Sequence, residues 1–209
     1  MLPAPRRTPL TFGYLVLLVA STVVLHVVSP ATRTLILGAS STDVWHLTRD
    51  PVRVLVASAV WVPGATWWLY VALLAVVLTP LERRLGGLRT ALIFATGHVL
   101  ATLGTEVPIG VAVAGGWLPA AAAHRFDVGV SYGLAAAGGA AIGLLRRPVR
   151  YPLLAAATVV IGVPLLRGPG MTTAGHAIAL LCGVAWWPWL ARGESGGAGR
   201  PRLALRRRG

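Results

Sequence analysis

Six apolar runs, each long enough to cross a lipid bilayer, dominate the 209-residue sequence. A membrane-spanning helix needs about 20 mostly apolar residues, so the chain has room for six spans and short loops. Only 12% of the residues are charged, against about 25% in soluble domains. The sequence therefore predicts an all-α membrane protein, a six-transmembrane-helix bundle. The expected spans are Leu10–Val28, Ala65–Leu81, Leu88–Thr105, Val128–Leu145, Tyr151–Leu166 and Thr172–Leu190.

The distribution of arginine predicts the orientation of these spans. All of the positive side chains other than histidine are Arg, and 14 of these 19 fall in segments on one side of the predicted bundle. Cytoplasmic loops carry the excess of positive charge, so both termini are expected to be cytoplasmic, in the inner (cytoplasmic) membrane of a bacterium. The Arg side chains on that side are expected to meet anionic lipid headgroups. The five on the opposite side are Arg33, Arg49, Arg53, Arg125 and Arg167.

These observations divide the chain into three parts. Residues 1–9 form a cytoplasmic N-terminal tail, residues 10–190 the membrane domain, and residues 191–209 an Arg- and Gly-rich cytoplasmic tail. The long connection Ala31–Pro63 is expected to lie in the outer interface, because it mixes Trp and Arg with an apolar stretch. The Arg-rich tail has no aromatic residue to stack on bases, so we expect no nucleic-acid partner.

A serine near the start of the fourth run is the first candidate for chemistry. Ser131 lies in a G-x-S-x-G sequence, but the strand-turn-helix context of a hydrolase elbow is missing. The alternative is a nucleophile at a helix N-terminus. There the backbone amides, with Gly129 just before the serine, could stabilise an oxyanion. Asp127, four residues before Ser131, is expected to cap this helix.

A histidine near the start of the sixth run is the matching candidate base. His176 is expected at the depth of Ser131, and the face of its helix continues through Ala179 and Gly183. The face of the serine is expected to continue through Ala135, Gly138 and Ile142, with Gly139 beside them. Small residues on both faces would let the helices approach closely. Such a Ser–His pair is sufficient for nucleophilic catalysis; the alternative from spacing alone is that the two side chains only hydrogen-bond as part of the interhelical packing.

Four segments resemble the rhomboid family of intramembrane serine proteases. The segment 81–86, L-E-R-R-L-G, is similar to the end of the family's second helix, and residues 129–131 are similar to its nucleophile motif. Gly175-His176, followed by Gly183, resembles its histidine motif, and residues 50–58 resemble its Trp-Arg stretch. The resemblance implies that Ser131 is the nucleophile and His176 the base. It also implies that the partners are transmembrane segments of other membrane proteins, cut near the outer leaflet without cofactor or metal.

The sequence departs from the family pattern where an oxyanion would be bound. Thr66 and Tyr70 occupy the positions of the family's H-x-x-x-N pair, and Tyr132 replaces the glycine after the nucleophile. Losing one oxyanion donor costs roughly 10²–10³ in rate. His98 is a candidate substitute donor, on a helix face shared with Glu106, although an interhelical polar stripe explains that face as well. An inactive relative, a pseudoprotease that binds membrane-protein clients, is therefore the main alternative.

A small transporter or a metal-handling protein is the remaining alternative. Its candidate residues would be His98, Glu106, His124, Asp127 and His176. They show no ligand spacing of the kind that metals require. No internal repeat of the transporter type is evident either.

Overall fold

The computed structural model describes residues 3–168 and 170–195. These residues form ten α-helices and one short 3-10 helix, and no strand is found among them. The predicted all-α class is therefore confirmed. The elements are α1 Pro9–Val27, α2 Pro30–Ala39, α3 Val44–Leu47, α4 Pro51–Ser58, α5 Trp67–Leu85, α6 Gly87–Ala114, η1 Ala120–His124, α7 Ser131–Gly143, α8 Arg147–Arg167, α9 Met171–Ala185 and α10 Trp187–Ser195. The C-terminal tail was predicted for residues 191–209, and its part beyond residue 195 lies outside the described residues.

The six predicted runs correspond to the long helices α1, α5, α6, α8 and α9 and to the shorter α7. Four helical stretches of the described chain are long and apolar enough to cross a membrane: Pro9–Val27, Gly87–Ala114, Arg147–Arg167 and Met171–Ala191. The other two differ for separate reasons. α7 has only 13 residues, and α5 carries Glu82, Arg83 and Arg84 in its last turn.

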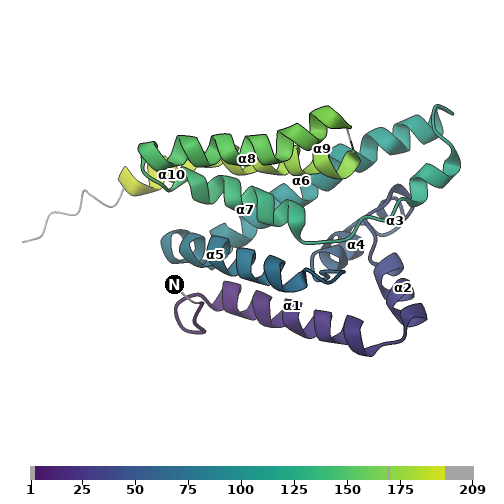
Figure 1. The fold of residues 1–209 in the computed structure, drawn as a ribbon, viewed down its shortest axis with the longest axis horizontal. Coiled ribbons are helices and arrows are strands. Elements are labelled where there is room, and N and C mark those ends of the chain that lie inside the picture. The colour runs from purple at the N-terminus through teal and green to yellow at the C-terminus, as the bar shows by residue number, and fades with distance from the viewer. Residues whose placement is uncertain (1–2, 169, 196–209) are drawn as a thin grey trace, which may run out of the picture.

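Helix α7 lies at the centre of the bundle (Figure 1). It packs against α6 on one side and α9 on another, and it also contacts α5, α8 and α10. Small residues make this close packing possible, because Ala136, Ala137 and Ala140 are completely buried. By contrast α8 packs mainly on α9 and α7, and none of its residues is buried. The first half of the chain adds α1, which packs on α5 and α6.

One end of the bundle is held together by charged side chains that cap helices. Both carboxylate oxygens of Glu82 accept hydrogen bonds from α1 backbone amides, at 2.9 Å from Leu10 N and 2.7 Å from Thr11 N. Arg84, two residues later, donates to the carbonyl of Leu144 at the end of α7 (2.7 Å). Arg150 donates to the carbonyl of Leu145 (3.2 Å). The Leu-Glu-Arg-Arg-Leu-Gly segment therefore ties the ends of three helices together.

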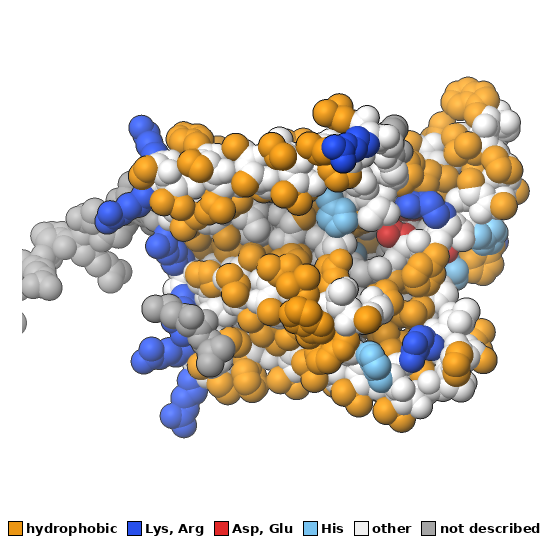
Figure 2. Space-filling model, viewed as in Figure 1, with side chains coloured by type: hydrophobic (Ala, Val, Ile, Leu, Met, Phe, Trp, Pro, Cys, Tyr) orange, Lys and Arg blue, Asp and Glu red, His pale blue; other side chains and the backbone are white. Residues whose placement is uncertain are grey.

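The side chains on the surface separate by type (Figure 2). Hydrophobic groups cover the long flank of the molecule, and Arg side chains gather at the end where α5, α8 and α10 begin or finish. The His and acidic side chains visible on this face lie toward the opposite end. The connection between α1 and α5 folds at that opposite end into α2, α3 and α4 (Figure 1).

Candidate functional site

Ser131 is the first residue of α7, and an irregular segment of chain leads into it. Its side chain is half-buried and lines a cavity of about 90 Å³. The same cavity is lined by Trp61 and Pro63, from the loop before α5, and by Tyr70 of α5. Tyr70 is one of the two residues that replace the family's H-x-x-x-N pair, while Thr66 is exposed at the N-cap of α5. Ser131 thus faces the α5 side of α7.

His176 meets Tyr132 of α7. The two rings pack edge-on, with 5.1 Å between centroids and 74° between planes. The tyrosine ring lies over Gly175, where an added Cβ would lie only 2.4 Å from Tyr132 Cζ. Tyr132 is 3% exposed and its hydroxyl has no hydrogen-bond partner among the described residues. In the part of the chain that the structure describes, no hydrogen bond joins Ser131 to His176.

The packing between α7 and α9 explains this arrangement. A Cβ at Gly183 would lie 2.1 Å from the Ala136 carbonyl oxygen, and a Cβ at Gly139 would lie 2.8 Å from the Leu180 carbonyl oxygen. Ala179 is completely buried in the same contact. The predicted face of α9, through Ala179 and Gly183, is thus the face that packs.

The predicted face of α7 is wrong by one residue. Ala135 is half-buried, and an added Cβ at Gly138 would meet nothing within 4 Å. Successive residues differ by about 100° around a helix. Packing through Tyr132, Ala136 and Gly139 therefore turns Ser131 away from α9.

The segment that precedes Ser131 is held by two separate elements. Arg125 pairs with Glu106 of α6, a carboxylate that is 1% exposed. Burial disfavours the charged guanidinium, but the hydrogen bond and the charge of Glu106 outweigh it and raise the pKa of Arg125. Two residues on, Asp127 binds the turn between α2 and α3. Its backbone N–H donates to Ser41 Oγ (3.1 Å), and its carbonyl accepts from Thr42 N (2.8 Å).

Asp127 does not cap α7, contrary to the sequence prediction. Val130 is the N-cap residue and makes no side-chain capping bond, and the side chain of Asp127 accepts instead from Thr42 Oγ1 (3.3 Å). Gly129, next to the cap, has a φ of 147°, a left-handed value that glycine tolerates better than other residues. Gly129 therefore serves the turn into α7.

His98 contacts a serine that the sequence analysis did not single out. Its Nε2 lies 3.0 Å from Ser58 Oγ and 3.1 Å from the Leu55 carbonyl oxygen. A carbonyl only accepts, so Nε2 carries the proton and donates. Both side chains are buried, at 4% and 0% exposure. The pair fastens α4 to α6, and it leaves Nδ1 of His98 without a partner among the described residues.

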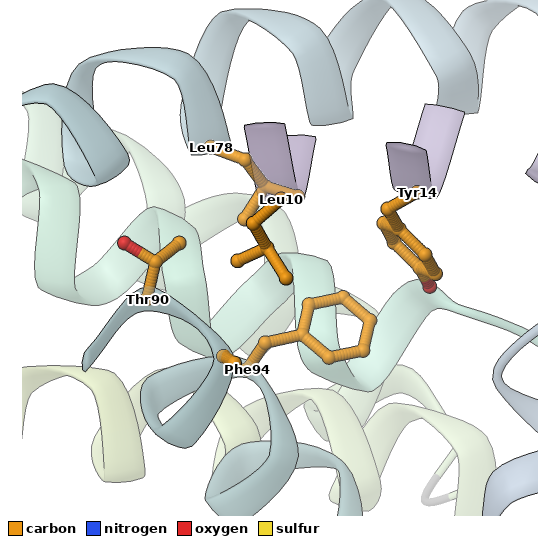
Figure 3. Close-up of a pocket in the computed structure, with 6 residues that line it drawn as sticks. Leu10, Tyr14, Leu78, Thr90 and Phe94 are labelled. Carbon is orange, nitrogen blue, oxygen red and sulfur yellow. The ribbon is translucent and has the colours of Figure 1, made fainter. Parts of the chain in front are cut away.

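A second small cavity lies near the Arg-rich end, between α1, α5 and α6 (Figure 3). It has a volume of about 110 Å³ and is lined mainly by Leu10, Tyr14, Leu78 and Phe94. The Tyr14 hydroxyl donates to the Ala59 carbonyl (2.7 Å). The cavity therefore presents no free polar group for chemistry.

Metal-binding geometry is not found in the described part of the chain. No group of three or more His, Cys, Asp or Glu side chains there is arranged to hold an ion. His26, His124 and His176 lie on different elements, α1, η1 and α9.

The fold and the motif segments agree with a comparison against known families. Residues 5–196 match the family model described as rhomboid-like protein. The chain therefore belongs to the rhomboid-like family, as the resemblance of its motifs predicted. No curated protein and no solved structure matches the chain.

Proposed function

We propose that the chain crosses the bacterial cytoplasmic membrane six times, with both termini in the cytoplasm. The gathering of Arg side chains at one end supports this orientation, and those side chains would meet anionic headgroups. With 13 residues, α7 is about 20 Å long, shorter than a hydrocarbon core of about 30 Å. Its position inside the bundle supports a span nonetheless, since irregular backbone at membrane depth is tolerated where protein surrounds it.

We further propose that the protein binds transmembrane helices of other membrane proteins without cutting them. The observation that carries this proposal is the contact between Tyr132 and His176, 5.1 Å between ring centroids. A base must lie within hydrogen-bonding reach of the nucleophile, about 2.6–3.2 Å or one water away. Here a buried aromatic ring stands beside the imidazole, and the serine faces the cavity with Tyr70.

The oxyanion side of the site supports the same conclusion. Thr66 at the start of α5 is exposed, and Tyr70 lines the cavity beside Ser131. The proposed substitute donor, His98, uses Nε2 to fasten α4. Its other ring nitrogen is then an acceptor in the neutral ring, so His98 offers no donor to an oxyanion.

The face of α7 left open by this packing is the proposed client site. Ser131, Ala135, Gly138 and Ile142 are all half-buried, and Gly138 has open space in front of it. Small side chains permit close approach of a second helix in the membrane. The neighbouring α8 has no buried residue, so its displacement by an entering helix would break few core contacts.

An active serine protease is the second candidate, and one observation favours it. Ser131 begins a helix and lines a cavity, and its hydroxyl makes no hydrogen bond in the described part of the chain. Its hydroxyl is therefore available at the positive end of a helix dipole. Catalysis would require Ser131 to come within hydrogen-bonding reach of His176.

Photo-crosslinking in membranes tests client binding. A photoreactive residue at Ala135 is expected to capture intact membrane proteins, whereas the same residue at Val23 of α1, 55% exposed, should capture lipid and few proteins. Equal capture at both positions would contradict a client site on α7. Captured fragments ending within a transmembrane segment would instead support the protease.

A further inference from the structure

An apolar groove runs along the outer half of α6, beside the short helix α3. It has a volume of about 310 Å³, and its lining residues include Val44, Leu47, Leu103, Glu106, Val107 and Val111. Leu103, Val107 and Val111 are 37%, 55% and 57% exposed, so the groove opens toward the lipid. Among these residues only Glu106 is charged.

Glu106 lines this groove and has one carboxylate oxygen that is enclosed by protein atoms and has no hydrogen-bond partner among the described residues. The Glu106 side chain is only 1% exposed, and Arg125 binds its Oε1 atom. Its Oε2 atom has no partner in the described part of the chain. A buried carboxylate oxygen without a donor costs about 1–3 kcal/mol or more. Asp43 and Asp127 also lie within electrostatic reach of Glu106, so three carboxylates face the one guanidinium of Arg125 and favour a positively charged donor.

Helix α3 indicates the depth of the groove in the bilayer. Trp45 is 39% exposed, and the Arg49 guanidinium stacks on its ring at 3.9 Å from the centroid. Exposed Trp and Arg side chains of this kind favour the headgroup level. The groove therefore lies where headgroups meet acyl chains, and a phosphate at this level would find Arg49 close by.

We propose that this groove binds a phospholipid whose headgroup ammonium carries N–H groups, as phosphatidylethanolamine does. The ammonium enters between the side chains that line the groove and donates to Glu106 Oε2, and an acyl chain lies along Leu103 and its exposed neighbour Leu100. A choline headgroup has the same charge but no N–H, so it cannot make this bond. A groove that merely contacts lipid would not distinguish the two.

Native mass spectrometry in detergent tests the proposal on the wild-type chain. Four lipids with identical acyl chains are titrated: phosphatidylethanolamine, its N-methyl and N,N-dimethyl forms, and phosphatidylcholine. The first three retain an N–H donor and are expected to bind similarly, with phosphatidylcholine roughly tenfold to a hundredfold weaker. Equal affinity for phosphatidylcholine, or a gradual loss with each methyl group, overturns the proposal.

Two variants locate the bound lipid. Val107→Trp fills the groove and keeps both residues of the Glu106–Arg125 pair, and Glu106→Gln removes the charge; both should abolish the preference. Val23→Trp on α1 is the matched control and should keep it. If Glu106→Gln does not fold, Val107→Trp decides alone. A preference that survives in Val107→Trp assigns the lipid to another surface and overturns the site.

Discussion

The Tyr132 ring packs edge-on against His176, with 5.1 Å between ring centroids, and covers the α-carbon of Gly175. The ring therefore does two things at once. It fills the space between α7 and α9, and it packs against the imidazole of His176. The small residue at 175 permits the first of these, because any side chain there would meet the ring.

Removing this ring should destabilise the protein and couple to Gly175. Tyr132→Ala leaves a cavity and is expected to cost about 3–5 kcal/mol. Gly175→Ala should be destabilising in the wild type, because its Cβ would lie 2.4 Å from Tyr132 Cζ, but nearly neutral in Tyr132→Ala. Unfolding of the four proteins in detergent gives the coupling free energy. Strictly additive effects would mean that the ring does not lie over Gly175.

Two adjacent glycines of α7 should respond oppositely to the same substitution. Gly139→Ala places a Cβ 2.8 Å from the Leu180 carbonyl oxygen, and overpacking of this kind costs about 1–3 kcal/mol. Gly138→Ala meets nothing within 4 Å and should be neutral or stabilising by up to about 1 kcal/mol. Thermal unfolding in detergent measures both. Reversed effects would restore the originally predicted face, with Ser131 toward α9.

Glu82 accepts hydrogen bonds from two backbone amides of α1, so substitutions at Glu82 should destabilise this helix end in proportion to the number of bonds lost. Glu82→Gln keeps one acceptor oxygen and leaves one of the amides of Leu10 and Thr11 unpaired, at about 1–3 kcal/mol. Glu82→Ala leaves both unpaired and should cost more. Hydrogen exchange at the first turn of α1 reports the local effect. Unchanged exchange in both variants would show that the cap contributes nothing to this helix end.

Breaking the buried ion pair Arg125–Glu106 should cost much more folding stability than breaking an exposed ion pair. Arg125→Gln leaves Glu106 buried without its partner and is expected to cost about 3–5 kcal/mol, while Arg125→Gln with Glu106→Gln should recover part of the loss. The control is the exposed pair Arg53–Asp50, 2.7 Å apart, for which Arg53→Gln should cost less than about 1 kcal/mol. Similar losses for the two arginines, measured by unfolding in detergent, would contradict the burial of Glu106.

The apolar runs predicted the position of most helices well, because polar residues or Pro mark the ends of these runs in the sequence. The first run was expected at Leu10–Val28 and the helix is Pro9–Val27. The third run was expected to end at Thr105, yet α6 continues to Ala114. Glu106 looked like a polar boundary, and its neutralisation by Arg125, 19 residues later in the chain, is a tertiary contact that the sequence pattern does not contain.

The orientation of α7 could not be read from its sequence. Residues 135–141 are all Ala or Gly, so no hydrophobic stripe marks a packing face. The face is chosen by the fit of the Tyr132 ring over Gly175 and by the close approach of Gly183 to Ala136. Ser58 was missed for a similar reason, since only folding of the α1–α5 connection brings it to His98.

Labelling with a serine-reactive fluorophosphonate tests the central claim, that this member of the family lacks an activated nucleophile, most directly. The purified wild-type chain is treated beside Ser131→Ala, His176→Ala and Tyr132→Gly, with an active serine protease as the positive control. All four proteins are expected to remain unlabelled. Labelling of the wild type that is lost in both Ser131→Ala and His176→Ala would contradict the claim and establish a protease.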